Sequence, residues 1–397
     1  MNVDSSAVSK TSAHPFDRSI SRLELKQRLF SFAREIGFDS CRIAGCGSPP
    51  HEEEFRKWLG EGGHGEMSYM ERGEEKRCDP QKVLPGACSI AVLALNYFQG
   101  KTKGARSLAA TGRIARYAWG DDYHDLIAGK LDKIDKFLRG FGGQQKYYVD
   151  TGPVLERDYA GEAGTGWHGK STMLINQRLG TWFFLAEVLT TLELPADEPV
   201  PARCGTCERC IRACPTGAIL APHRLDARRC ISYLTMELKG SIPIDLRPMI
   251  GDRIFGCDDC LDACPWNRFA QVSRESAFSA RPSTVGIPLR HYLRLSDEDF
   301  RVLFKASPIK RIKRRGFLRN VCVALGNIGD PSDLPALERA AADPEQLIAE
   351  HAQWAIQQIR VRHTPSRRPI RKEDRHRSGE LQLIKSKPVA GCIPELL

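Results

Sequence analysis

The sequence predicts three parts in order: an α/β domain, a small cysteine-rich module and an all-α C-terminal part. Helix-like and strand-like patterns alternate over residues 21–198. Eight closely spaced cysteines fall within residues 199–275, and a helical hydrophobic period runs through residues 276–361. A chain of 397 residues can bury two or three cores of this size.

The first part alternates amphipathic helices with short apolar strands. Apolar residues three and four apart predict helices at RLELKQRLFSFAREIG (22–37), EEEFRKWL (52–59) and YHDLIAGKLDKIDKFLRG (123–140). Runs rich in β-branched and aromatic residues predict strands at DSCRIAG (39–45), SIAVLALNYF (89–98) and KYYVD (146–150). The long irregular stretch 150–170 is of the kind that tends to be functional. Its five glycines predict close backbone approach to a large ligand with polar edges.

Within that stretch, residues 164–171 read GTGWHGKS and match the glycine-rich loop of triphosphate-binding proteins letter for letter. Such a loop needs a buried strand before it and a helix after it. The preceding LERDYAGEAG is charged and broken by glycines, and Gly180 with the β-rich TWFF interrupts any long helix downstream. The match is therefore interpreted as accidental.

The cysteine spacing predicts two [4Fe–4S] clusters of the bacterial ferredoxin type. Residues 204–215 read CGTCERCIRACP, a complete C-x2-C-x2-C-x3-C-P run, and residues 257–265 (CDDCLDACP) lack only the first cysteine of a second run. In two-cluster ferredoxins the cysteine before proline serves the other cluster. By this crossing, one cluster takes Cys204, Cys207, Cys210 and Cys264, and the other takes Cys214, Cys230, Cys257 and Cys260. Zinc is the alternative, because C-x2-C pairs also build four-cysteine zinc sites, but it is the less specific match.

Positive charge is concentrated near the C-terminus. The net charge is +10, and residues 305–319 alone hold seven Lys/Arg and no acid. Interleaved with apolar residues, this segment predicts a surface that binds a polyanion. Residues 360–378 are also basic, but the Arg-, Pro- and Ser-rich tail from 362 to 397 is expected to be disordered and solvated.

The remaining segments predict a cytoplasmic protein. Residues 1–20 are polar and flexible with no apolar signal segment, and no apolar stretch is long enough to span a bilayer. In residues 314–359, Phe317, Val321, Leu325 and Ile328 fall on one helical face, which is typical of a HEAT-type repeat. With barely more than one repeat unit, this part is expected to share a core with the cysteine-rich module.

Five stretches together resemble the epoxyqueuosine reductase family across roughly residues 20–360. They are RYAWGDDYH, VDTGPVLERDYA, GTGWHGK, the eight cysteines, and SPIKRIKRRGFLRNVCVALGN. The resemblance implies a cobalamin-binding N-terminal domain related to reductive dehalogenases, the two-cluster ferredoxin module and a HEAT-like part. It also implies reduction of the epoxide of epoxyqueuosine in tRNA to the alkene of queuosine. The expected partners are tRNA and an external low-potential electron donor, and a monomer suffices.

The resemblance also implies residue roles. Asp150 is the expected proton donor, with a pKa raised by the apolar and aromatic residues before it, and the alternative is a residue that caps the D-T-G-P turn. The expected cobalamin site comprises Arg72, Asp150, Arg157, Lys170, Ser171, Asp258 and Asp259. Arg157 has a structural ion pair with Glu156 or Asp158 as its alternative. The expected tRNA contacts are Lys310, Arg311, Lys313, Arg314, Arg315 and Arg319.

Histidines are not expected to bind the cobalt. Asp122 and His124 begin a D-x-H-x-x-G cobalamin signature, but Ile127 replaces its glycine, so His124 and His168 are interpreted as hydrogen-bonding residues. Two other functions remain as alternatives. A corrinoid reductive dehalogenase would have no use for the basic segment, and a non-enzymatic electron carrier or tRNA-binding scaffold would not need the large first domain.

Overall fold

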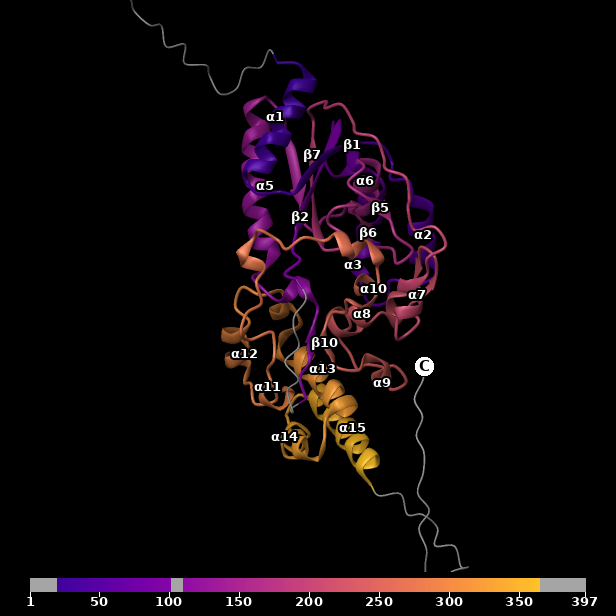
Figure 1. Cartoon of the computed structure of the whole chain (residues 1–397), viewed down its shortest axis with the longest axis vertical. Helices are drawn as coiled ribbons and strands as arrows, with labels where there is room; N and C mark the ends of the chain where they lie inside the picture. The colour runs from indigo at the N-terminus through magenta and orange to yellow at the C-terminus, as the bar shows by residue number, and fades with distance from the viewer. Residues whose placement is uncertain (1–19, 101–109, 365–397) are drawn as a thin grey trace, which may run out of the picture.

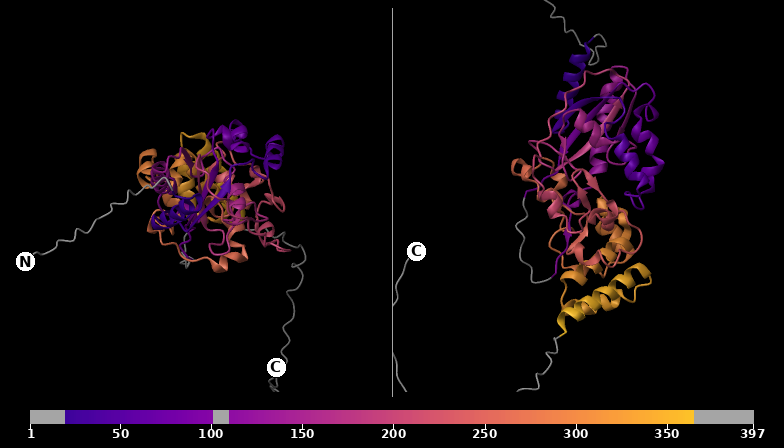
Figure 2. Two further views of the ribbon diagram at one scale, coloured as in Figure 1. Left: turned by 90° about the horizontal axis from the view of Figure 1, so that it is seen from above. Right: turned by 90° about the vertical axis from the view of Figure 1, so that its right-hand side faces the viewer.

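The computed structural model describes residues 20–100 and 110–364. The expected flexible N-terminus and basic tail lie almost wholly in residues 1–19 and 365–397, outside the described residues. The described chain is elongated, with the sheet at one end, the cysteine-rich segment in the middle and the C-terminal helices at the other end (Figure 1, Figure 2). Over the described ranges, none of the helices combines the length and apolar character needed to cross a membrane.

The first domain is built on a four-stranded sheet in the order β1-β2-β7-β4. The strands are β1 (Ser40–Gly45), β2 (Ser89–Asn96), β7 (Phe183–Thr190) and β4 (Gln145–Tyr148). All neighbouring strands of this sheet are antiparallel. Although helices and strands alternate along the chain, the sheet contains no parallel pair. Every residue of β2 is buried, because β2 is central and both faces of the sheet are covered.

The two faces of the sheet belong to different cores. Ala91, Leu93 and Leu95 of β2 pack with the helices α1 (Arg22–Glu35) and α5 (Tyr123–Gly140). The alternate residues Ile90 and Val92 pack with α6 (Glu156–Glu162) on the other face. This period of two follows from the strand pleat, which turns successive side chains to opposite faces. Figure 1 shows α1 and α5 on one side of the sheet and α6 on the other.

The predicted helices and strands of this domain are present, but one strand was missed. β7 occupies the apolar run FFLAEVLT, which was interpreted only as an interruption of helical pattern. The GTGWHGKS string contains β5 (Trp167–His168) and leads into β6 (Leu174–Ile175), with which β5 forms a hairpin, so it is not a strand–loop–helix. Its match to a triphosphate loop is accidental, as predicted.

Short elements connect the domain to the cysteine-rich segment. Within the first domain they are α2 (Glu52–Gly60), α3 (Ser68–Arg72), α4 (Glu74–Cys78) and β3 (Arg113–Ile114). The cysteine-rich segment contains α7 (Arg209–Ala213), β8 (Ile219–Ala221), β9 (Arg224–Leu225), α8 (Ile231–Met236), α9 (Arg247–Ile250), β10 (Arg253–Phe255) and α10 (Asp259–Asp262). β3 pairs with β10 in parallel, which ties the two parts together.

The C-terminal helices share one core with the cysteine-rich segment. They are α11 (Leu289–Tyr292), α12 (Asp297–Leu303), α13 (Lys313–Ile328), α14 (Leu334–Ala340) and α15 (Gln346–His363). α13 is buried from Gly316 to Gly326 and packs against α15 on one side and α8, α9 and β10 on the other. Within the described C-terminal residues, α13 with α15 is one pairing of long helices, which does not establish a HEAT-type repeat.

Candidate active site and cysteine centres

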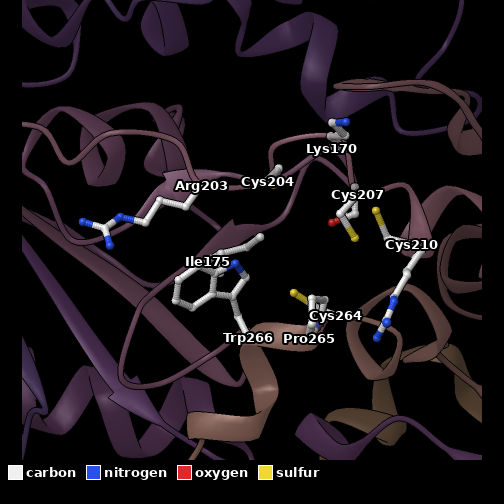
Figure 3. A pocket seen from close by; sticks show the side chains of 11 residues that line it. Lys170, Ile175, Arg203, Cys204, Cys207, Cys210, Cys264, Pro265 and Trp266 are labelled. Carbon is white, nitrogen blue, oxygen red and sulfur yellow. The ribbon is translucent and has the colours of Figure 1, made fainter.

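Four cysteines from two separate runs line one cavity. Cys204, Cys207 and Cys210 enter it from the segment around α7, and Cys264 enters it from the end of α10. Figure 3 shows the sulfur atoms of Cys207, Cys210 and Cys264 turned toward a common space. Burial raises the pKa of Cys264, a backbone hydrogen bond at Trp266 lowers it, and the thiols of Cys204, Cys210 and Cys207 raise it further. Four thiols in one cavity are a suitable donor set for an iron–sulfur cluster.

The other four motif cysteines form a second group. Burial raises the pKa of Cys260 well above its ordinary value, and the nearby thiols of Cys230, Cys257 and Cys214 raise it further. Cys230 lies at the start of α8, far in sequence from the rest of its run, and the fold brings it to them. The structure thus brings together the two groups of four that crossed ligation requires.

Asp150 lies two residues after the end of β4 in a left-handed backbone conformation, with φ of 59°. This region is uncommon for residues with a Cβ, and such strain is frequent at functional sites. Tyr123 Oη donates a hydrogen bond of 2.9 Å to Asp150 Oδ2, and His124 Nε2 lies 3.4 Å from the same oxygen. The side chain of Asp150 is 58% exposed, so it is held from within but open to a substrate.

The predicted rise of the Asp150 pKa is wrong for this structure. Burial acts to raise the pKa of Asp150, but the hydrogen bonds from His124 and Tyr123, with the charges of His124 and Arg157, lower it below its ordinary value. The prediction considered only the residues before Asp150 and missed the two donors on α5. Asp150 is therefore a carboxylate near neutral pH until a neighbour protonates it.

Two other acids beside Asp150 hold their protons more strongly. Burial raises the pKa of Glu156 to about 7, and the charge on Asp150 contributes to the rise. Burial raises the pKa of Glu187 on β7 well above its ordinary value, with further effects from Glu156 and Asp150. Glu187 was missed, although a single acid within the apolar run FFLAEVLT is a recognisable signal. This group of acids thus combines a low-pKa carboxylate with acids that titrate at higher pH.

Arginines surround this group of acids. Arg157 Nη1 donates to the backbone oxygen of Thr172 at 3.4 Å, and its charge acts on Asp150 and Glu156. Arg77, which the sequence did not single out, is buried and donates to Val154 O at 3.3 Å. Arg72 is exposed at the end of α3. Arg157 and Arg77 therefore lie near Asp150 and Glu156, and the assignment of Arg157 and Arg72 to a cobalamin site stays a prediction.

Several buried polar atoms around Asp150 make no hydrogen bond. Within the described ranges they include Arg77 Nε and Glu187 Oε1. Unpaired buried polar groups are rare in folded proteins because each costs about 1–3 kcal/mol. A ligand with amide groups at its edge would pair with such atoms.

The glycines of residues 150–170 do not leave room for a ligand in the way predicted. A Cβ at Gly164 would meet the backbone oxygen of Glu198, and one at Gly166 would meet that of Ile175. A Cβ at Gly152 would meet the Tyr148 side chain. The chain's own packing therefore requires these glycines.

Lys170 and Ser171 line the cavity of the first cysteine group rather than the surroundings of Asp150. The reason is that Trp167 of the hairpin packs edge-on against Trp266, which follows Cys264. Their role in cobalamin binding stays a prediction. His168 Nε2 lies 3.3 Å from Asp158 Oδ1, and His51 Nδ1 lies 2.9 Å from the same atom. Both imidazole rings therefore contact the Asp158 carboxylate.

The carboxylates of Asp258 and Asp259 are engaged with arginines. Asp258 accepts a hydrogen bond of 2.8 Å from the Arg116 backbone N–H and pairs with its guanidinium at 3.4 Å. Asp259 pairs with Arg253 and, at 3.3 Å, with Arg113. Both side chains therefore fix the second cysteine group to the first domain, and only their backbone remains available for a cofactor.

The predicted tRNA residues separate into exposed and buried sets. Lys310, Arg311, Lys313 and Arg315 are exposed, whereas Arg314 is largely buried and pairs with Asp343. Arg319 is 1% exposed and donates to the backbone oxygens of Leu234, Leu238 and Gly240. The assignment of Arg319 to tRNA is wrong, because its guanidinium holds α13 against the cysteine-rich segment.

Comparison with known proteins matches this arrangement. Residues 203–267 match the 4Fe-4S double cluster binding domain, and residues 77–151 match the domain described as epoxyqueuosine reductase QueG, DUF1730. The epoxyqueuosine reductase of Xanthomonas campestris is 44% identical over 337 residues, which cover 83% of this chain and 95% of the relative. That of Escherichia coli is 40% identical and covers 86% and 91%. The chain belongs to the epoxyqueuosine reductase family.

Solved structures of the family agree with this fold. An epoxyqueuosine reductase with an epoxyqueuosine-modified tRNA-Tyr stem loop has a TM-score of 0.80 at 32% identity, covering 85% of this chain and 91% of its own. The Bacillus subtilis enzyme, solved with a catalytic aspartate loop swung out of the active site, has a TM-score of 0.79 at 31% identity with the same coverage. A reductive dehalogenase has a TM-score of 0.41 at 16% identity, covering 64% of this chain and 33% of its own, and the relation of the first domain to that family stays a prediction. The chain is an oxidoreductase that contains a 4Fe-4S domain.

Proposed function

We propose that this enzyme reduces the epoxide of epoxyqueuosine in tRNA to the alkene of queuosine, the last step of queuosine formation. The observation that carries the proposal is the likeness, over 85% of the chain, to an epoxyqueuosine reductase with a tRNA stem loop. The reaction takes up two electrons and two protons and releases the epoxide oxygen as water. The chain must therefore supply a route for electrons and a source of protons.

The two cysteine groups supply the electron route. Cys204, Cys207, Cys210 and Cys264 would hold one [4Fe–4S] cluster, and Cys214, Cys230, Cys257 and Cys260 the other. Clusters of this type transfer single electrons, which an external low-potential donor would provide. Because α7 and α10 pack together, the two groups lie side by side between the first domain and the C-terminal helices.

The residues around Asp150 fit a bound cobalamin. Its amide-fringed edge would pair with Arg77, with Glu187 and with Arg157, whose unpaired or weakly paired polar atoms surround the site. When bound, cobalamin would supply the reducing electrons to the substrate carbon. His124 is held between Asp122 and Asp150, which supports a cobalt with no protein histidine ligand.

Asp150 would donate the proton to the epoxide oxygen. An alkoxide is a poor leaving group, and a positioned acid contributes roughly 10²–10⁴-fold to such a step. Its exposed side chain and strained backbone favour this role over a turn cap, and the catalytic aspartate loop of the Bacillus subtilis relative agrees with it. Lys310, Arg311, Lys313 and Arg315 would contact the tRNA phosphates.

The test is reduction of epoxyqueuosine-containing tRNA by anaerobically purified, cluster-loaded protein with and without added cobalamin. Mass analysis of the nucleosides should show product lighter by one oxygen atom only with cobalamin and a reductant. Reduction without cobalamin would contradict a role for the corrinoid. Intact clusters and bound cobalamin without reduction of the tRNA would favour a dehalogenase that acts on a small molecule. Intact clusters without bound cobalamin would favour an electron carrier.

A further inference from the structure

Four contacts connect two cations of the exposed basic segment to Asp150 through Asp122 and His124. Asp122 caps the N-terminus of α5, and its side chain is 1% exposed. Its Oδ1 lies 2.8 Å from His124 Nδ1, and the opposite ring atom, Nε2, lies 3.4 Å from Asp150 Oδ2. The imidazole therefore bridges two carboxylates, one buried and one open to the substrate.

The buried carboxylate also faces two cations of the basic segment. Asp122 Oδ2 lies 3.2 Å from Arg311 Nη2 and 3.7 Å from Lys310 Nζ. Both cations keep nearly half of their side chains exposed, so each can also meet a ligand from solvent. Among the described residues, Asp122 Oδ2 makes no hydrogen bond, and it is held by charge rather than by directed donors.

We propose that RNA phosphates and Asp122 share Arg311 and Lys310, so that docking of tRNA favours protonation of His124 by solvent, and His124 then passes this proton to Asp150. The inference rests on the proposed function. Phosphate binding neutralises the two cations, and the Asp122 carboxylate then has the His124 imidazole as its remaining cationic partner. His124 Nε2 gives its proton to the ionised Asp150 carboxylate at Oδ2, Asp150 passes that proton to the epoxide oxygen, and solvent returns a proton to His124.

The electrostatics around His124 give the direction of this coupling. Its charged and titratable neighbours are Asp122 and Tyr123 on α5, Asp150 after β4, and Arg311 and Lys310 before α13. Burial acts to lower the pKa of His124, the bonds to Asp122 and Asp150 raise it above its ordinary value overall, and the charge of Arg311 opposes that rise. Neutralising Arg311 therefore raises the pKa of His124 further, and by linkage a protonated His124 strengthens RNA binding.

The test is proton uptake when the cluster-loaded full-length protein binds an unmodified anticodon stem loop. Calorimetry in buffers of different ionisation enthalpy counts the protons, and the logarithm of Kd against pH gives the same quantity independently. The wild type should take up a fraction of a proton near neutral pH and bind more tightly as pH falls. His124→Gln and Arg311→Gln should both lose this uptake.

Lys313→Gln is the matched control, because Lys313 is exposed in the same segment and no contact joins it to Asp122. It should weaken binding while leaving the proton uptake unchanged. Uptake that persists in His124→Gln, or an equal loss in Lys313→Gln, would overturn the coupling. Failure of the wild type to bind the stem loop would instead contradict the proposed tRNA surface, so the two failures are distinguishable.

Discussion

At the scale of single residues, the active site separates its acids by environment. Asp150 accepts hydrogen bonds from α5 and ionises easily, while Glu156 at the start of α6 is partly buried, Glu187 on β7 is fully buried, and both resist ionisation. Because their pKa values differ, one of these acids can be ionised while another still carries its proton at the same pH. Reduction of an epoxide consumes two protons, so a second proton carrier near Asp150 has a use.

Glu156 gives a stability prediction with a defined sign. Its pKa is raised from 4.5 to about 7, so the folded state binds more protons than the unfolded state between these values. The stability linked to this group is full below pH 4.5 and is lost as pH rises through 7. Glu156→Gln should therefore flatten the fall in unfolding free energy between these values, as measured by denaturant titration. An equally steep fall in the variant would contradict the assignment.

His124 and Glu156 also predict the pH dependence of turnover. Both groups have raised pKa values, so the rate should fall as pH rises and their protons are lost. If His124 supplies the proton to Asp150, His124→Gln should lower the rate at low pH and remove its fall with rising pH. Glu156→Gln should keep this fall in rate. Single-turnover rates from about pH 6 to about pH 9, a window that begins near the ordinary pKa of histidine and includes the raised value of about 7 for Glu156, provide the measurement. The reverse assignment of the two variants would identify Glu156 as the carrier.

At the scale of elements, the close approach of α13 and α15 depends on Gly326, which has no side chain. A Cβ at Gly326 would collide with the Trp354 ring on α15. Gly326→Ala should therefore lower the unfolding free energy by about 1–3 kcal/mol, as overpacking of a core does. Gly129→Ala on α5 is the matched control, because its Cβ meets nothing and alanine favours a helix by about 1 kcal/mol. Equal effects of the two substitutions would contradict this packing.

The crossed cysteine groups predict the iron content of single variants. Cys230→Ser removes one thiolate from the group of Cys214, Cys257 and Cys260 and leaves the other group complete. About half of the iron should be lost, because each proposed site holds one of two similar clusters. Cys88→Ser, at an exposed cysteine outside both groups, should keep all of it. Full iron content in Cys230→Ser would contradict the grouping.

The sequence predicted the elements with strong patterns and failed where tertiary contacts decide. The helices α1 and α5 follow their hydrophobic period, and the strands β1, β2 and β4 coincide with runs rich in β-branched and aromatic residues. β7 was missed because a short apolar run has no period that separates strand from helix. Arg319 looks like its exposed neighbours in sequence, and only its bonds to the carbonyls of the segment around α8 reveal that it is a buried structural residue. The low pKa of Asp150 depends on residues almost thirty positions earlier, which no local pattern shows.

At the scale of the whole molecule, the exposed basic residues lie beside the active site rather than at the far end of the C-terminal helices. Arg311 pairs with Asp122 at the start of α5, next to the Tyr123 and His124 that hold Asp150. The positive charge that would attract an RNA backbone therefore lies close to Asp150, where the modified base of the proposed substrate would be reduced. A reductase of free small molecules would not require this arrangement.

Neutralising the exposed set to glutamine, at Lys310, Arg311, Lys313 and Arg315 together, should weaken tRNA binding and flatten its salt dependence. Each phosphate that the protein no longer neutralises reduces the slope of log affinity against log salt by roughly 0.7–0.9. Lys133→Gln, at an exposed lysine on α5, should leave the slope unchanged. An unaltered slope in the fourfold variant would mean that these side chains only face solvent.

The central claim is that Asp150 protonates the epoxide oxygen of a tRNA-bound substrate, and a comparison of Asp150→Asn with the wild type tests it most directly. Both proteins should carry the same iron and cobalamin and bind epoxyqueuosine-containing stem loop equally, because the amide keeps the shape of the side chain. In a single turnover followed by nucleoside mass analysis, the variant should form queuosine roughly 10²–10⁴-fold more slowly. A near-normal rate in Asp150→Asn with its cofactors intact would contradict this role of Asp150.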